Sequence, residues 1–210
     1  MVTLTSEEER IKSIINFFKD YKLHILSVIL VIALSTGGYF FTTSFKSNQI
    51  QTAKVIYEDW QVASDPDYSE ELFQKLTINF SQTGYSHLAL LKKGSDLAKE
   101  DNLEGSLRMF YQLKENSDGY FGNSLINGIA RTNIARISIA VGKFEDALVV
   151  LEKYSNDEDA YTHELKGDAL TGVGSNDLAL QQYQSALEKY ADSGLRNLVE
   201  LKINNLNINE

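Results

Sequence analysis

Near its N-terminus the chain contains 23 consecutive residues without a charged side chain. No Asp, Glu, Lys or Arg occurs between Lys22 and Lys46, and eleven of residues 23–41 are Leu, Ile, Val or Phe. As a helix, this segment would reach about 34 Å, which exceeds the ~30 Å of a hydrocarbon core. Its apolar side chains favour membrane insertion by roughly 3–7 kcal/mol before the polar ones are subtracted. The segment therefore predicts a transmembrane helix over residues 23–45.

A cleaved secretion signal would also contain an apolar run. Residues 33–35, Ala-Leu-Ser, have the small-x-small form of a cleavage site and follow a ten-residue, mostly apolar run. However, the apolar run continues through Phe41, and the segment before it is 22 residues long with three glutamates at positions 7–9. These lengths and flanking residues favour an anchor that is retained.

Basic residues flank the predicted span unequally. Four Lys or Arg residues precede it, and two follow within about 15–20 residues. Because Lys and Arg are enriched on the cytoplasmic side of membrane spans, this bias predicts a cytoplasmic N-terminus. The expected organisation in a bacterium is a cytoplasmic segment over 1–22, an inner-membrane span over 23–45 and a periplasmic domain over 46–210.

Residues 8–21, just before the span, have the apolar pattern of one helix face. Ile11, Ile14, Ile15 and Phe18 recur at positions i, i+3, i+4 and i+7. Two interpretations fit this pattern. One is a short amphipathic helix along the inner membrane interface, and the other is an ordinary helical lead-in to the span.

Three later stretches, which begin at Gly94, Ala135 and Gly167, share a pattern of small and bulky residues. Each reaches a turn residue seven positions on, a second small residue five positions later, and a bulky residue four positions after that. Small residues let two helices approach closely and bulky ones fill the remaining space, so the pattern predicts helical hairpins. The turn residues are Asp101, Gly142 and Gly174, the second small residues Ser106, Ala147 and Ala179, and the bulky residues Phe110, Leu151 and Tyr183.

The third stretch resembles the tetratricopeptide repeat. The middle one departs from the others by placing Ser138 where they have Leu97 or Leu170. The turns are 41 and 32 residues apart, on either side of the ~34-residue period of that family, so an insertion is expected at 115–124. The resemblance implies an all-α fold, in which one transmembrane helix precedes an α-solenoid of helical hairpins. It rests on Gly167, Leu170, Gly174, Ala179, Tyr183 and Ala186.

The C-terminal sequence KINNL, residues 202–206, resembles the ending of the YfgM family, the ancillary subunit of the bacterial Sec translocon. The resemblance extends over the short N-terminal segment, the span and the repeat domain. It implies that the domain binds the SecYEG channel and the membrane-anchored parvulin-like chaperone PpiD, and assists newly translocated proteins. Unfolded client proteins are a further candidate partner, and a general cell-envelope scaffold is the alternative function. By local sequence alone, the ending is a helix terminus capped by Asn, with Leu201 and Leu206 docked on the last hairpin.

Residues suited to catalysis or metal binding are not grouped in the sequence. His24, His87 and His163 are isolated, and there is no cysteine. The formal net charge of −9 lies wholly in residues 23–210, which argues against nucleic acid as a partner of the folded part. We therefore expect a non-enzymatic protein without catalytic residues, metal or cofactor.

The predicted protein-binding surface is the concave side of the solenoid, formed by the first helix of each hairpin. Its apolar members also suit packing against a neighbouring helix. Arg136 is its one basic member, so a carboxylate clamp for peptide C-termini is not expected. The members of this concave set are Leu88, Leu91, Ser95, Ile129, Thr132, Arg136, Tyr161, Glu164 and Asp168.

Overall fold

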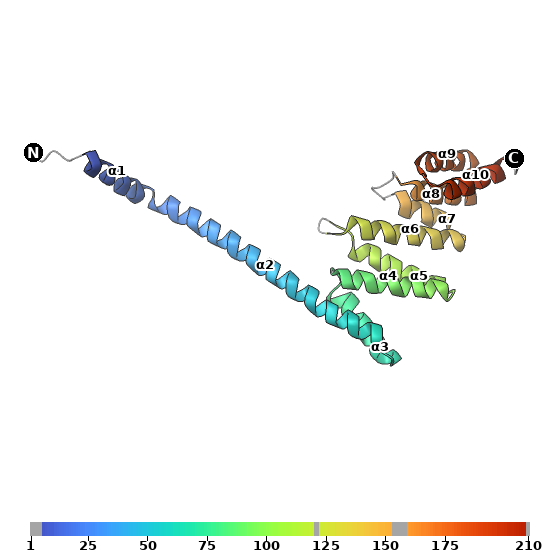
Figure 1. The fold of residues 1–210 in the computed structure, drawn as a ribbon, viewed down its shortest axis with the longest axis horizontal. Coiled ribbons are helices and arrows are strands. Elements are labelled where there is room, and N and C mark those ends of the chain that lie inside the picture. Colours follow the sequence, from blue (N-terminus) through green and yellow to red (C-terminus); the bar gives the residue numbers. More distant parts are fainter. Residues whose placement is uncertain (1–5, 120–121, 153–158, 209–210) are drawn as a thin grey trace, which may run out of the picture. The chain divides into compact units, whose positions relative to one another are not determined.

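The computed structural model describes residues 6–119, 122–152 and 159–208. Over these residues the chain forms ten α-helices and no β-strand, which confirms the all-α fold (Figure 1). Residues 1–51 and 52–210 form two compact units.

The first unit contains α1 (Ser6–Asp20) and most of α2 (Lys22–Val62). The expected span lies inside α2, whose most apolar stretch has a mean hydropathy of 2.0 and no buried residues. The helix is therefore long and apolar enough to cross a membrane. It runs without interruption through the expected domain boundary at 45/46, and the second compact unit begins at Thr52.

The end of α2 belongs to the helical domain. Ala53 and Ile56 are buried, and Tyr57 and Trp60 pack against the same hydrophobic core. The Trp60 ring centroid lies 5.7 Å from that of Phe73 in the next helix. These residues thus pack the end of α2 into the domain.

The next helix, α3 (Pro66–Asn79), is capped by Asp65. Asp67 and Ser69, which also have cap-type side chains, lie inside the helix. Pro66 occupies the first helical position, where its missing N–H costs nothing, and the Asp65 Oδ1 atom accepts a hydrogen bond of 2.8 Å from the Tyr68 N–H.

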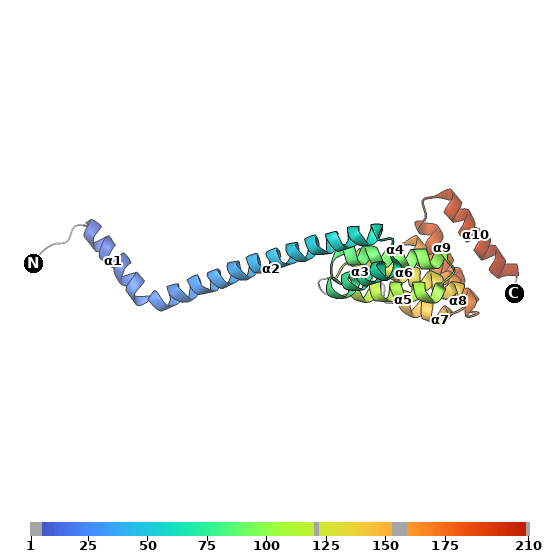
Figure 2. The same cartoon turned by 90° about the horizontal axis from the view of Figure 1, so that it is seen from below.

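The remaining helices form successive hairpins, and each helix contacts the next along the chain (Figure 1). They are α4 (Gly84–Lys99), α5 (Leu103–Asn116), α6 (Ser124–Ala140), α7 (Phe144–Glu152), α8 (Ala160–Gly172), α9 (Asn176–Lys189) and α10 (Ser193–Ile208). In Figure 2, α4 and α6 lie along one side of the stack and α5 and α7 along the other. The insertion expected at 115–124 overlaps the connection between α5 and α6, in which residues 120–121 lie outside the described residues.

The three hairpin turns share one left-handed backbone conformation. The φ angles of Asp101, Gly142 and Gly174 are 60°, 76° and 77°. In each turn the following N–H donates to a carbonyl five residues earlier, and in the middle turn this is a 2.8 Å bond from Lys143 to Ser138. Ser138 therefore occupies the same position as its leucine counterparts, and the middle repeat keeps the common register.

Small residues face bulky ones across the hairpins. A Cβ atom added at Gly94 would lie 3.1 Å from the Phe110 ring, and one added at Gly167 would lie 2.4 Å from the Tyr183 ring. The second small residues, which include Ala147 and Ala179, are fully buried, as is Ala186. In the α4–α5 and α8–α9 hairpins, the backbone of one helix thus meets an aromatic ring of the other.

The buried apolar residues form two separate clusters. The larger runs from Ala53 in α2 to Ala169 in α8, and the smaller joins α9 and α10. In α10, Val199 and Leu206 are buried, whereas Leu201 is 60% exposed, so its expected docking was wrong. The helix also continues through the asparagines of the KINNL sequence to Ile208 instead of ending there.

Candidate protein-binding surface

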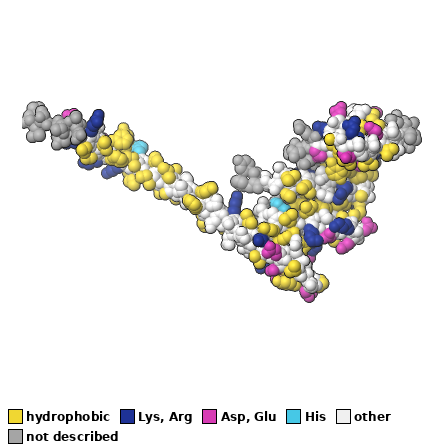
Figure 3. All heavy atoms as spheres, in the orientation of Figure 1, with side chains coloured by type: hydrophobic (Ala, Val, Ile, Leu, Met, Phe, Trp, Pro, Cys, Tyr) yellow, Lys and Arg dark blue, Asp and Glu magenta, His cyan; other side chains and the backbone are white. Residues whose placement is uncertain are grey.

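Four apolar members of the concave set lie on the first helices of the hairpins. Leu88 in α4 is 46% exposed and Tyr161 in α8 is 38% exposed, while Leu91 and Ile129 are partly buried. Leu125, in the first turn of α6, is 67% exposed and was missed because the repeat pattern does not include it. On the face drawn in Figure 3, hydrophobic side chains gather over the middle of the helical domain. These helices thus expose apolar side chains that their own packing does not bury.

The polar members on α4 and α6 are partly exposed. Ser95 and Thr132 are partly buried, and the Thr132 hydroxyl donates to the Gly128 carbonyl of its own helix. Arg136 is exposed, and its guanidinium donates a 2.9 Å hydrogen bond to the Asn133 side chain. The Arg136 guanidinium thus has a hydrogen-bond partner on its own helix, and it is accessible at the surface.

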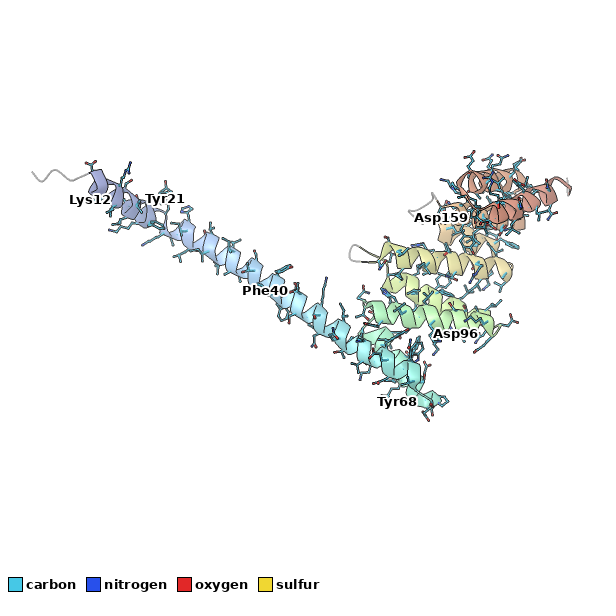
Figure 4. All side chains as sticks on the ribbon, viewed as in Figure 1. Lys12, Tyr21, Phe40, Tyr68, Asp96 and Asp159 are labelled. Carbon is cyan, nitrogen blue, oxygen red and sulfur yellow. The ribbon has the colours of Figure 1, made fainter. Side chains whose placement is uncertain are left out.

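Local capping positions Tyr161 at the start of α8. Asp159, labelled in Figure 4, accepts a 2.8 Å hydrogen bond from the Tyr161 N–H and a second bond from the Thr162 N–H. The Thr162 hydroxyl donates to the same carboxylate. Because an N-cap of this kind fixes the first turn of a helix, the exposed tyrosine ring is held on a defined backbone.

The two acidic members of the concave set are engaged by the chain itself. Lys202 in α10 donates hydrogen bonds of 2.7 Å to both Glu164 and Asp168 in α8. The Tyr190 hydroxyl donates to Glu164 at 2.6 Å, and the Tyr183 hydroxyl donates to Asp168 at 2.9 Å. We call these five residues the Lys202 cluster. Glu164 is buried and Asp168 partly buried, so neither is the open ligand-facing carboxylate that the repeat register suggested.

Electrostatic interactions within the Lys202 cluster favour the charged form of Lys202. Burial lowers the pKa of Lys202, but the hydrogen bonds and charges of Asp168 and Glu164 outweigh this effect, and the pKa is raised. Burial, together with the neighbouring carboxylates, raises the pKa of the Tyr183 and Tyr190 hydroxyls. Both tyrosines therefore stay protonated and act as hydrogen-bond donors.

A buried arginine holds the end of α7 against α6. Arg131 is 7% exposed, and it donates bonds of 2.6 Å to the Asn127 side chain and 3.1 Å to the Val150 carbonyl. The repeat pattern does not include Arg131, because the Val150 carbonyl that it binds lies 19 residues away, in the next helix. The guanidinium satisfies a carbonyl near the C-terminus of α7, which is where a cation is favourable.

A cavity of about 390 Å³ lies between the start of α4 and the α5–α6 connection. His87 lines it, with its Nε2 atom 3.3 Å from the Asn116 carbonyl oxygen, and burial lowers the pKa of this histidine.

The part of the chain that the structure describes contains no group of three His, Cys, Asp or Glu residues arranged to hold a metal ion.

Comparison with known proteins bears on the family of the chain. No curated protein and no solved structure matches the chain. A family model described as tetratricopeptide repeat-like domain matches residues 16–208. This match includes all the helical hairpins and α2. The chain therefore belongs to the tetratricopeptide repeat-like domain family.

Proposed function

We propose that this chain is a non-enzymatic ancillary subunit of the bacterial Sec translocon. In this proposal α2 anchors it in the inner membrane with its N-terminus in the cytoplasm, and the repeat domain lies in the periplasm. The domain binds SecYEG and the chaperone PpiD, and assists newly translocated chains. The resemblance of the KINNL ending and of the chain's organisation to the YfgM family supports this specific assignment.

The observation that carries the binding role is the exposure of Leu88, Leu125 and Tyr161. Helical-repeat domains use the first helices of their hairpins to form extended binding surfaces. Large apolar side chains on such a surface favour association with a protein partner, because their burial removes apolar area from water. The proposed interface is therefore apolar, with Arg136 as its exposed cation.

A general cell-envelope scaffold is the second candidate, because the same span and apolar surface would also hold another membrane or outer-membrane assembly together. The two functions differ in the proteins that remain bound when membranes are gently solubilised. Recovery of SecYEG and PpiD would support the translocon role, and recovery of an outer-membrane assembly without them would support the scaffold.

The proposed topology predicts which side of the membrane each terminus occupies. The chain has no cysteine, so single cysteines provide unambiguous probes. In cells with a permeabilised outer membrane, an impermeant thiol reagent should label a Ser193→Cys variant and spare a Ser13→Cys variant. Both positions are exposed in the structure, so a difference reports the membrane and not burial. The reverse pattern would place the repeat domain in the cytoplasm and overturn the translocon role.

The exposed leucines should determine partner recovery. In a Leu88→Gln/Leu125→Gln variant, copurified SecYEG and PpiD should fall by about five-fold or more, as expected when central apolar contacts are lost. Ile78→Gln is the matched control, because Ile78 in α3 is 64% exposed and lies outside the proposed surface. The fluorescence of Trp60, the one tryptophan in the sequence, checks that the variants remain folded. Unchanged recovery from the folded double variant would contradict the proposed surface.

A further inference from the structure

The first helix, α1, has an apolar face that the structure leaves uncovered. Its aliphatic and aromatic side chains are 46–57% exposed, although an isolated helix in water gains nothing from exposing them. The residues are Ile11, Ile14, Ile15, Phe17 and Phe18, and Tyr21 follows directly after the helix. Something other than the described residues must cover this face if it is to leave water.

The helix segregates its charges around that face. At ~100° per residue, the apolar side chains and Tyr21 occupy an arc of about 160°. Lys12 and Lys19 lie beyond one border of the arc, and Arg10 lies at the other border. Glu9 lies on the opposite side of the helix, and Asp20 lies about as far from the arc as Lys12 does, beyond the Phe17 border. Among residues 9–21 the charged side chains nearest the apolar face, Arg10 and Lys19, are thus basic, which suits an anionic lipid surface.

The position of α1 in the chain identifies which surface is available. One residue, Tyr21, separates α1 from α2, and the backbone bends at this residue. The Tyr21 ring lies 4.9 Å from the Phe17 ring and 6.1 Å from the His24 ring, between centroids (Tyr21 and Lys12 are labelled in Figure 4). The uncharged segment of α2 begins immediately after Lys22. The apolar face of α1 therefore lies next to the end of the proposed span, where the chain enters the membrane.

We propose that α1 lies in the plane of the membrane interface and binds anionic lipid headgroups. Ile11, Ile15 and Phe18 lie at the boundary of the acyl chains. Lys12 and Lys19 extend their amino groups from the border of the apolar face to the lipid phosphates, as long basic side chains do at interfaces. This inference rests on the proposed span of α2, because the span is what brings α1 to the surface.

The test uses the full chain, reconstituted in vesicles of phosphatidylcholine and phosphatidylglycerol. Single cysteines carry a nitroxide label at Ile15→Cys or Phe18→Cys on the apolar face, and at Asn16→Cys on the opposite face as the matched control. A fourth label, at Val31→Cys, reports the span. We expect labels on the apolar face to collide several-fold more with oxygen than with a water-soluble nickel complex, and the Asn16→Cys label to show the reverse preference.

The label at Val31→Cys distinguishes a failure of the inference about α1 from a failure of the proposed span. If it lies in lipid while the labels on the two faces of α1 are equally accessible to water, the span stands and the inference about α1 fails. If it is accessible to water, the span itself fails. Protection of the Ile15→Cys label that grows with protein concentration in detergent, without lipid, would show that a second copy covers the face and would also overturn the inference.

The basic border supplies a charge test. In vesicles with phosphatidylglycerol, a Lys12→Gln/Lys19→Gln variant should lose much of the lipid protection at the Ile15→Cys label. A Glu9→Gln variant is the control, since it removes a charge from the side of the helix opposite the apolar face, and protection should persist. Equal protection in both variants would contradict the role of anionic headgroups.

Discussion

A Gly167→Ala variant should unfold more readily than the wild-type chain, by about 2 kcal/mol. The added Cβ atom would lie 2.4–2.9 Å from three atoms of the Tyr183 ring, which is closer than van der Waals contact. The ring is buried and its hydroxyl is bonded to Asp168, so it cannot move aside without losing other contacts. Intrinsic helix propensity alone would favour alanine over glycine by about 1 kcal/mol, so the sign of the effect distinguishes close packing from propensity.

The matched control for this substitution is Gly84→Ala. Gly84 opens α4, and an added Cβ atom there meets nothing within 4 Å. This variant should be neutral or slightly stabilised. Urea unfolding followed by far-ultraviolet circular dichroism measures both variants, and amide hydrogen exchange in α8 and α9 locates the loss. A Gly167→Ala variant as stable as Gly84→Ala would mean that α8 and α9 are not tightly packed at this position.

A Lys202→Met variant should lose about 2–3 kcal/mol, because it leaves Glu164 and Asp168 without their cation. Removing one partner of a fully buried pair costs about 3–5 kcal/mol, and we expect less here because the Lys202 side chain is 26% exposed. The loss should appear as faster hydrogen exchange in α10, whose contact with α8 depends on this side chain. Lys189→Met, an exposed position in the last turn of α9, is the control for removing a positive charge.

Neutralising the carboxylates should restore stability. Adding Glu164→Gln and Asp168→Asn to Lys202→Met removes the uncompensated charges, so the triple variant should be more stable than Lys202→Met alone. Since the pKa of Lys202 is raised above 10.5, its contribution is fully present below that value and is lost as pH rises through the higher folded pKa. The effect of Lys202→Met should therefore be the same across neutral pH. Failure of the triple variant to recover would assign the loss to packing instead of charge.

The Lys202 cluster also limits which part of the concave side is open to a partner. Glu164 and Asp168 bind Lys202, so they are not free acidic ligands for a cationic partner. The open part is apolar and includes Leu88, Leu125 and Tyr161. A partner that fits this surface should bring apolar side chains, which is what unfolded segments also expose.

Local patterns in the sequence were sufficient for the long apolar helix and for the hairpins. The absence of charged residues over 23–45 indicated the long apolar helix, and small and bulky residues at fixed spacing indicated the hairpin register. The left-handed conformations of Gly142 and Gly174, and the close approach of Gly167 to Tyr183, follow from that register. These features were predictable because each depends on residues within one hairpin, where helical geometry fixes which side chains meet.

Only the tertiary structure decided which polar groups pair. Lys202 meets Glu164 and Asp168 across 38 and 34 residues, and Arg131 meets the Val150 carbonyl across 19. The repeat register placed both carboxylates on a concave face but contained no information on the angle at which α10 returns to α8. That angle depends on packing between helices, and it determines whether a charged side chain faces water or a buried partner. Sequence spacing fixed the elements of this protein, and the sum of non-local packing contacts fixed the part of its surface that remains open.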